Sequence, residues 1–319
     1  MSWKLANIVS IFKKGKRDFV ENYRFISLLP VISKVLERCV LAGLRDHISH
    51  LISPKQHGFL AGRSCVTPLT SVLHYIGGQL DASKQIDSIY LDMSKAFDQV
   101  DHTNLLGRLH IYGITSKLHD WLRSYLQRRK QQIAVLGATS QKLPVTSGVP
   151  QGSLLRPILF LLFVDDLPNT VKTLRVACYA DDTKIFKSID SITDCNALQS
   201  DLNDLVIWSE SSGLIFHQSC KYQCITRKKS PVQPTYIINE TPLESCDTEK
   251  DRGLGASSNL TSDKQVTEQR AKANELLGFV RRASRYVQST QTRRTLYLSI
   301  VRLRNPGMVP TVHWLTKAS

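Results

Sequence analysis

The sequence predicts an α+β fold built around an antiparallel sheet. Segments typical of strands occur in neighbouring pairs, as hairpins require, and helical segments separate these pairs without a repeating strand–helix unit. A repeating unit would instead favour a doubly wound parallel sheet. The chain has 319 residues, of which 42% are hydrophobic and 22% are charged, so it can bury a sizeable core.

Helices are predicted where apolar side chains recur three or four residues apart. Val31, Val35 and Leu36 begin one such series, and Asp194 is the predicted N-cap of another. An apolar run with a proline in its first turns indicates a further helix at Ser153–Phe163. The periodic segments are Val31–His47, Asn104–Ile111, His119–Leu126, Asp194–Ser211, Lys264–Arg282 and Thr292–Val301.

Strands are predicted where short β-branched or aromatic runs end in turn residues. Ile86–Leu91 is one such run. Gln132–Val135 and Leu143–Thr146 flank a glycine and predict a hairpin, and Leu174–Phe186 predicts two short strands joined at Asp181 and Asp182. The prolines of Pro231–Pro234 indicate a domain boundary near residue 230.

The charge balance indicates a polyanionic partner. Lysine and arginine total 42 against 27 acidic residues, a formal net charge of +15, and such an excess most often serves nucleic acid. Any single basic cluster can equally be a solvated surface, but three of one sign favour a groove that binds phosphates. The three clusters are Lys13–Arg17, Arg128–Lys130 and Arg227–Lys229.

Several classes of protein are not supported. The longest apolar run, Ile158–Val164, is far shorter than the roughly 20 residues of a membrane helix, and Met1–Ser10 lacks the apolar core of a signal peptide. The seven cysteines are scattered without the paired spacing of a zinc site, so we interpret them as reduced thiols of an intracellular protein.

Acidic residues stand at two strand ends. Asp92 follows the predicted strand Ile86–Leu91, and Asp181 and Asp182 share the tip of a predicted hairpin. Adjacent like charges repel unless a cation screens them, and hairpin tips prefer Asn-Gly or Asp-Gly. If the strands are neighbours, the carboxylates converge as ligands for Mg²⁺, and two ions roughly 3.5–4 Å apart suit phosphoryl displacement. The alternative is a polar turn and a strand-end acid without a metal, which spacing alone does not exclude.

Longer motifs surround these acids. Leu91–His102 (LDMSKAFDQVDH), Ser147–Ser153 (SGVPQGS) and Tyr179–Asp182 (YADD) occur in this order. They resemble the A, B and C motifs of reverse transcriptases, and their residues are most similar to those of jockey-like non-LTR (LINE-type) retrotransposons. Further segments resemble the same family, so the similarity covers nearly all of residues 1–300. These segments are Lys13–Gly15, Asn22–Leu29, Gln56–Ser64, Trp208–Phe216, Lys250–Asp251 and Lys272–Phe279.

The resemblance implies a right-hand polymerase with fingers (1–85), a palm (86–228, with a helical insertion around 104–140) and a connection with a partial thumb (229–319). It implies an RNA-directed DNA polymerase that joins a dNTP to a primer 3′-OH. Its partners would be an RNA template and a DNA primer or target in the nucleus or cytoplasm, with no membrane. Asp92, Asp181 and Asp182 would be the catalytic ligands of two Mg²⁺ ions, with Mn²⁺ as a substitute, and the Met93 carbonyl would assist.

The resemblance also assigns a nucleotide site. Phe97 takes the place of the bulky side chain that excludes a ribose 2′-OH, although a core aromatic is the alternative. Gln151 and Gly152 would lie against the incoming nucleotide and template, and Gly148 and Gly152 permit close backbone approach. Three cations are candidates for triphosphate binding, with plain surface charge as the alternative. They are Arg24, Lys34 and Arg63.

Some positions depart from the family pattern. Arg156 replaces the usual glycine, and we expect it to cost stability or to block close packing. The segment Phe216–Lys221 is one residue short, so Lys221 is only a guess for the pyrophosphate-side lysine. The family's endonuclease domain is not present, and we expect a fragment of a longer polyprotein. A truncated, impaired remnant that only binds nucleic acid therefore remains an alternative, and the oligomeric state is not indicated.

Overall fold

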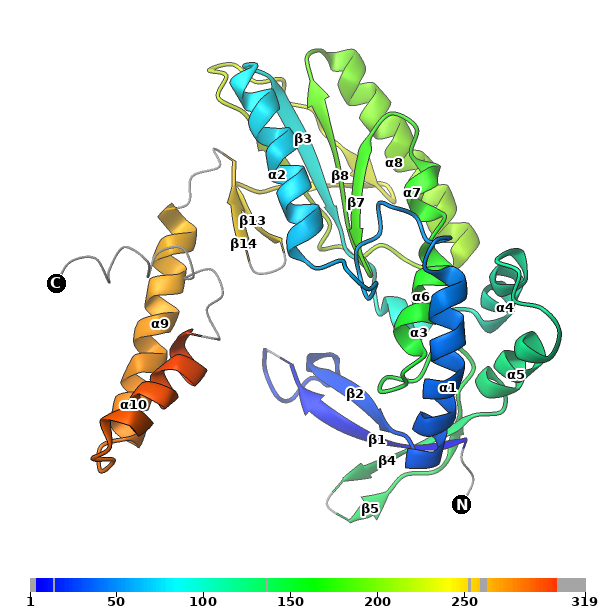
Figure 1. Ribbon diagram of the computed structural model, residues 1–319. Helices are drawn as coiled ribbons and strands as arrows, with labels where there is room; N and C mark the ends of the chain where they lie inside the picture. Colours follow the sequence, from blue (N-terminus) through cyan, green and yellow to red (C-terminus); the bar gives the residue numbers. More distant parts are fainter. Residues whose placement is uncertain (1–3, 14, 136, 252–253, 259–262, 303–319) are drawn as a thin grey trace. The chain divides into compact units, whose positions relative to one another are not determined.

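The computed structural model describes residues 4–13, 15–135, 137–251, 254–258 and 263–302 (Figure 1). The chain forms two compact units, Met1–Cys246 and Asp247–Ser319. Predictions that concern Lys14 or residues 303–319, which include the far part of the predicted thumb, lie outside the described residues. The boundaries of fingers, palm and thumb, and the break near residue 230, stay predictions.

A five-stranded sheet lies at the centre of the first unit, in the order β12–β9–β3–β8–β7. The central strand β3 is antiparallel to both β8 and β9, and β7 and β8 form a hairpin. The edge strand β12 joins β9 in parallel. The predicted α+β class with an antiparallel sheet is therefore confirmed. The strands are β3 (Gln85–Leu91), β7 (Arg175–Tyr179), β8 (Asp182–Ile189), β9 (Lys221–Ile225) and β12 (Glu244–Ser245).

Both faces of the central strand are covered. Alternate residues of a strand point to opposite faces, and Ser88 and Ile89 of β3 are both fully buried. Helix α2 (Val66–Asp81) packs on β3 and β7, and α8 (Ile192–Ser212) packs on β8 (Figure 1). This double cover leaves the ends of the strands as the open part of the sheet.

A second sheet joins segments that are far apart in the sequence. Strand β1 pairs antiparallel with β2 and parallel with β4. The hairpin predicted around Gly137 is present, since β5 and β6 both pair with β4. The strands are β1 (Leu5–Phe12), β2 (Tyr23–Leu28), β4 (Lys130–Val135), β5 (Ala138–Thr139) and β6 (Leu143–Pro144). A 3-10 turn, Val20–Asn22, leads into β2.

Five helices encoded between β3 and β7 contribute a large share of the core. The segment Ile158–Val164 of α6 is buried at every residue, as its apolar run predicts. Helix α6 begins at Arg156, three residues after the predicted start, because Ser153 forms a turn with Pro150. Gly113 ends α4 with a φ of +78°, a left-handed conformation that glycine adopts readily. The helices are α3 (Ala96–Gln99), α4 (His102–Ile111), α5 (Ser116–Leu126), α6 (Arg156–Val164) and α7 (Leu167–Thr170).

Helix α1 (Val31–Ile48) begins at the predicted residue and ends one residue after the predicted end, but it buries a different face. Val31 and Val35, which the periodicity placed inward, are exposed. Glu37 is fully buried instead, and its carboxylate accepts hydrogen bonds from Tyr125 Oη (2.9 Å) and the Leu154 backbone N–H (2.7 Å). The buried face of α1 therefore carries Leu41, Leu44 and Ile48 together with a carboxylate whose oxygens are hydrogen-bonded.

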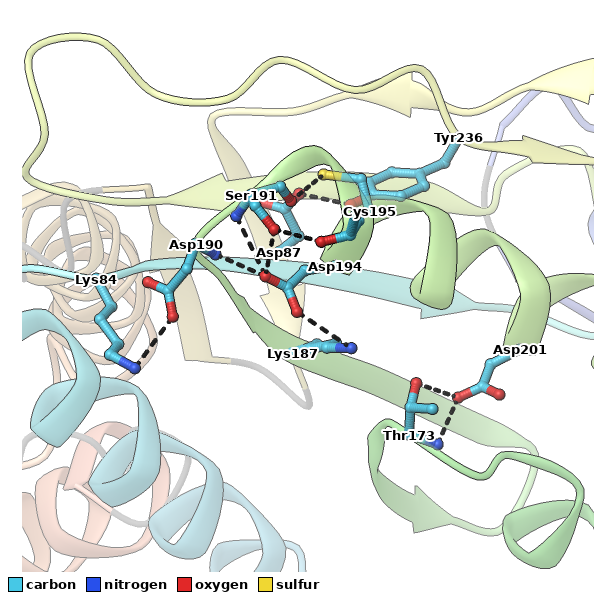
Figure 2. Close-up of polar contacts among 11 residues, drawn as sticks. Lys84, Asp87, Thr173, Lys187, Asp190, Ser191, Asp194, Cys195, Asp201 and Tyr236 are labelled. Atoms are coloured by element: carbon cyan, nitrogen blue, oxygen red, sulfur yellow. Dashed lines mark hydrogen bonds and ion pairs between the residues drawn. The ribbon is translucent and has the colours of Figure 1, made fainter.

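Helix α8 begins with a capping box. Ser191 is the N-cap, and its side chain and that of Asp194 bond each other's backbone N–H groups (Figure 2). The sequence prediction of Asp194 as the N-cap is wrong by three residues, because Asp194 occupies the N3 position of the box. An ion pair of 3.5 Å between Asp194 and Lys187 ties this helix end to β8.

The end of the first unit and the second unit add small elements. A short hairpin of β10 (Ile237–Ile238) and β11 (Thr241–Pro242) precedes β12. In the second unit, β13 (Thr248–Asp251) and β14 (Leu254–Ser257) form a hairpin. It continues with α9 (Asp263–Ala283), α10 (Thr290–Leu296) and a π-helix over Tyr297–Arg302.

The helices predicted near the C-terminus are confirmed. In α9, Val280 and Ala273 are buried in a small cluster with Val301, against which Leu276 packs. Of the helices that the structure describes, none combines the length and the apolar composition needed to cross a membrane.

Candidate active site

The register of the central sheet brings the separated acids together. Strand β3 ends at Leu91, which pairs with Thr183 of β8. Continuing this antiparallel register by one residue sets Asp92 level with Asp182. Opposite residues of such a pair point to the same face, with Cα atoms about 4.5–5.5 Å apart. The register of β3 and β8 therefore places these two carboxylates at the same open end of the sheet.

The third acid lies in the turn beside them. The β7–β8 hairpin turns through Ala180 and Asp181, between the paired residues Tyr179 and Asp182. Ala180 has a φ of +59°, a positive value of the kind that tight hairpin turns require at their first central residue. Asp182 is thus already the first residue of β8, one residue earlier than a turn made of both acids would place it.

The environment of Asp181 shows that it is close to Asp92. Asp181 is half-buried, whereas Asp92 and Asp182 are exposed. Burial raises the pKa of the Asp181 carboxyl, and the negative charge of Asp92 raises it further. The cations Arg156 and Lys13 oppose this rise. The site therefore holds two repelling carboxylates whose repulsion a bound cation would relieve.

The segment that departs from the family pattern encloses Asp92. Ser219 Oγ donates a hydrogen bond to Asp92 Oδ2 (2.9 Å), and the backbone N–H of His217 donates to the Asp92 carbonyl (2.8 Å). The Cys220 thiol contacts the same backbone, and Met93 pairs with Phe216. Ser219 is a contact that the motifs did not predict. The shortened segment Phe216–Lys221 therefore still orients the carboxylate.

The carboxylates of the site suit a magnesium ion whose coordination shell is completed by water and substrate. In the part of the chain that the structure describes, no three Asp, Glu, His or Cys side chains are arranged to hold a metal ion by themselves. Mg²⁺ in phosphoryl-transfer sites keeps several waters and takes one or two carboxylates together with substrate phosphates. Exposed Asp92 and Asp182 beside Asp181 supply hard oxygens of this kind. These residues therefore fit Mg²⁺ as part of its coordination shell, with the remaining ligands supplied by water and substrate.

Phe97 lies at the edge of the core next to these acids. It stacks on Phe160 with ring centroids 4.0 Å apart and meets Phe59 edge-on at 6.3 Å. The Arg156 guanidinium lies over the Phe97 ring, 4.7 Å from its centroid, and bonds Asp98 Oδ1 at 2.9 Å. Phe97 is only half-buried. The ring is thus both a core contact and part of the surface near Asp181.

The glycines of the SGVPQGS segment approach the protein backbone closely. A Cβ on Gly152 would lie 2.7 Å from the carbonyl oxygen of Ser27, and one on Gly148 would lie 2.7 Å from that of Asp98. Both have positive φ angles, +108° and +77°. The Ser27 N–H also donates to the Gln151 carbonyl at 2.7 Å. This close packing joins the loop to β2 and α3, and its approach to a nucleotide or template stays a prediction.

The three candidate triphosphate cations have different surroundings. Arg24 on β2 and Lys34 in the first turn of α1 are exposed. Arg63 is half-buried, and its guanidinium donates to backbone carbonyls at Ser53 (3.2 Å) and Gln56. Arg63 therefore holds the loop before α2, and its role toward a triphosphate stays a prediction.

One residue of the site had no role predicted from the sequence, although it begins the family-like segment Gln56–Ser64. Gln56 is 2% exposed, and its side-chain oxygen accepts a hydrogen bond from the Ala180 backbone N–H (2.8 Å). It thereby contacts the turn that carries Asp181. A glutamine far from the acids in sequence carries no spacing signal, so only the folded chain identifies this contact.

This arrangement, with carboxylates at a β-hairpin tip beside a central strand of an antiparallel sheet, defines the class. The family model described as reverse transcriptase (RNA-dependent DNA polymerase) matches residues 11–251. The chain belongs to the reverse transcriptase family.

Its relatives come from non-LTR retrotransposons. The chain is 30% identical over 310 residues to the probable RNA-directed DNA polymerase from transposon X-element of Drosophila melanogaster, which covers 94% of this chain and 34% of that protein. It is 31% identical over 221 residues to the RNA-directed DNA polymerase from mobile element jockey of the same species, covering 66% of this chain and 24% of the relative. The chain thus spans about a third or less of the length of these proteins.

Solved structures share the fold. Telomerase from Candida albicans, in complex with a TWJ fragment of telomeric RNA, superposes with a TM-score of 0.56 at 12% identity and covers 80% of this chain and 46% of that one. Telomerase from Candida tropicalis in a similar complex gives a TM-score of 0.54 at 11% identity, over 99% of this chain and 55% of that one. The predicted right-hand polymerase fold is confirmed.

Proposed function

We propose that this chain is the RNA-directed DNA polymerase domain of a non-LTR retrotransposon. It would join the α-phosphate of a dNTP to a primer 3′-OH on an RNA template. The observation that carries the proposal is the β3–β8 register, which brings Asp92 to the turn of Asp181 and Asp182. Family membership and a net charge of +15 support a nucleic-acid substrate.

The side chains at the sheet end act by position and charge. Asp92, Asp181 and Asp182 would hold two Mg²⁺ ions, with Mn²⁺ as a substitute, and the Met93 carbonyl would contribute a further oxygen. When bound, such ions activate the primer hydroxyl and stabilise the triphosphate and the departing pyrophosphate. Phosphoryl transfer needs little covalent help, so the work of the protein is to orient these carboxylates. Ser219 and the backbone of His217 do so for Asp92.

The surrounding residues would select the nucleotide. Phe97 would stand against the sugar and exclude a 2′-OH, with Phe160 fixing its ring from behind. Gln151 and Gly152 would meet the incoming nucleotide and template, on a loop that Ser27 and the close packing of Gly152 hold against β2. Arg24, Lys34 and Arg63 would receive the triphosphate charge.

Primer extension tests the proposal. The purified chain, an RNA template, an annealed DNA primer, dNTPs and Mg²⁺ should give extended primers, and Asp181→Ala should abolish the product. Asp201→Asn is a matched control, because Asp201 is a buried acid of the same unit. Its carboxylate accepts hydrogen bonds from the backbone N–H groups of Lys172 (3.3 Å) and Thr173 (2.8 Å) and from the Thr173 hydroxyl (2.8 Å). Extension that survives Asp181→Ala would refute the assignment.

The same assay separates the alternative function. A catalytically impaired remnant would bind RNA with a steep dependence on salt but extend no primer. In the structure, Arg156 is accommodated by hydrogen bonds and Phe216–Lys221 still holds Asp92, which favours the polymerase.

A further inference from the structure

The loop before α2 runs beside the hairpin that carries two of the acids. The His57 backbone N–H donates to the Cys178 carbonyl at 2.9 Å, and the Cys178 N–H donates to the Lys55 carbonyl at 3.0 Å. Gln56 and Cys178 form a parallel bridge. The segment 55–58 is therefore attached to the outer edge of β7, close to the turn at Ala180.

Gln56 makes the contact with the turn itself. Its side-chain Oε1 accepts hydrogen bonds from the backbone N–H groups of Ala180 (2.8 Å) and Gly58 (2.9 Å). Its Nε2 donates to the Ala180 carbonyl at 3.2 Å. One amide thus satisfies both backbone groups of Ala180. Gln56 is only 2% exposed, so water competes little for these hydrogen bonds.

The turn needs such support. Ala180 has a φ of +59°, in the left-handed region that L-residues rarely adopt. Glycine would adopt it freely, so the conformation of this turn depends on its surroundings. Since Asp181 and Asp182 follow directly, any change at Ala180 re-aims both carboxylates.

The loop also lies as close to the turn as the backbone permits. A Cβ on Gly58 would lie 2.5 Å from the Ala180 nitrogen, a distance that real side chains do not adopt. The other end of the loop is anchored on α7 and on Asp165, which directly follows α6. Lys55 Nζ donates to the Pro168 carbonyl (3.0 Å), and the Ser53 N–H donates to Asp165 Oδ1 (2.7 Å). The loop is thus a fixed support.

We propose that Gln56 is a positioning residue for the carboxylates, which it orients by holding the backbone of Ala180. The proposal rests on the proposed function, because it concerns the same site. Gln56 touches no substrate in this role. It sets where Asp181 and Asp182 stand when a divalent cation and the triphosphate bind.

The test compares two buried glutamines of the same unit. Gln56→Ala removes the support of the turn. Gln85→Ala is the matched control, because Gln85 is fully buried and its amide likewise bonds a backbone, the N–H and carbonyl of Val232 (both 2.8 Å), near the opposite end of β3. Both variants should lower the melting temperature. Only Gln56→Ala should reduce kcat and raise the half-saturating Mg²⁺ concentration, each by about 10- to 100-fold, as residues that orient metal ligands do.

A second variant acts on the same contact from the other side. Gly58→Ala keeps Gln56 but forces the loop and the turn apart, so it should reproduce the shift in Mg²⁺ dependence. It decides the question if Gln56→Ala does not fold. The positioning role is overturned if the folded Gln56 or Gly58 variant has the same kcat and the same half-saturating Mg²⁺ concentration as the wild type.

A metal titration separates this proposal from the proposed function. Mn²⁺ binding, followed by electron paramagnetic resonance in the absence of nucleic acid, should be weaker in Gln56→Ala than in the wild type and unchanged in Gln85→Ala. If the wild type binds Mn²⁺ but extends no primer, the polymerase assignment falls and the titration still decides the role of Gln56. If the wild type extends primers and the Gln56 variant matches it in both measurements, only the positioning proposal falls. A wild type that does neither overturns both.

Discussion

We predict that Arg156 stabilises the site region, although the family pattern has a glycine there and a cost was expected from the sequence. Its guanidinium bonds the Val149 carbonyl (2.5 Å) and Asp98 Oδ1 (2.9 Å) and lies over the ring of Phe97. Replacing it by methionine keeps the length of the side chain and removes all three interactions. We therefore expect Arg156→Met to destabilise the first unit.

The size of the effect follows from the exposure of each contact. The Asp98 side chain is 60% exposed, so the ion pair is screened and contributes about 0.5 kcal/mol. The charged hydrogen bond to the carbonyl contributes about 1.5 kcal/mol, and the cation–π contact about 0.5–1 kcal/mol. The contacts overlap, so we expect a loss of about 2 kcal/mol in the free energy of unfolding. For a unit of this size, that lowers Tm by roughly 4–8 °C.

Urea and thermal unfolding, monitored by circular dichroism, measure this loss. Arg108→Met is the matched control, because Arg108 pairs with Asp166 at 2.6 Å and lies over Phe163, away from Asp181. Both variants should lose similar stability, but only Arg156→Met should also weaken primer extension. If Arg156→Met or Arg156→Gly unfolds at the same free energy as the wild type or a higher one, the contacts of the arginine do not stabilise the unit and our interpretation is wrong.

Two further predictions concern buried acids. Burial raises the pKa of Asp87 above its ordinary value of 3.8, so the folded chain holds this proton to higher pH than the unfolded chain. The stability that this proton contributes is complete below pH 3.8 and declines as pH rises through the raised value. In urea unfolding measured from below pH 3.8 upward, the free energy of unfolding should decline less with pH in Asp87→Asn than in the wild type. Parallel curves for the two proteins would contradict the raised pKa of Asp87. Glu37→Ala leaves the buried Tyr125 hydroxyl and the Leu154 N–H without this acceptor, so its unfolding free energy should fall by about 3 kcal/mol, whereas a loss below about 1 kcal/mol would show that the network is dispensable.

The sequence predicted the location of the acids well for a physical reason. Strand ends and hairpin tips are local features, and a strand pairing fixes which of them meet, so Asp92 and Asp182 could be brought together before the structure was known. The family motifs added the roles that we propose for these residues. The bounds of α1 were also predictable, because periodicity is local.

The face of α1 and the support of the turn could not be predicted. Glu37 faces inward because Tyr125 and Leu154, distant in sequence, supply its hydrogen bonds, and periodicity counts only apolar residues. Gln56 acts on Ala180 through backbone groups that every sequence shares. The contacts of Arg156 likewise arise from tertiary packing, which is why the substitution was expected to be a cost.

The parallel pairing of β1 with β4 limits how this chain can be divided. Residues 5–8 lie in the middle of a sheet whose other strands include residues 130–133, so the sheet is completed only after α2, β3 and the helices α3–α5 have been made. An expression fragment that starts after Phe12 would leave β2 and β4 with two unpaired edges. Such a trimmed protein should therefore self-associate, and shortening the chain for crystallisation is safer from the second unit than from the amino end.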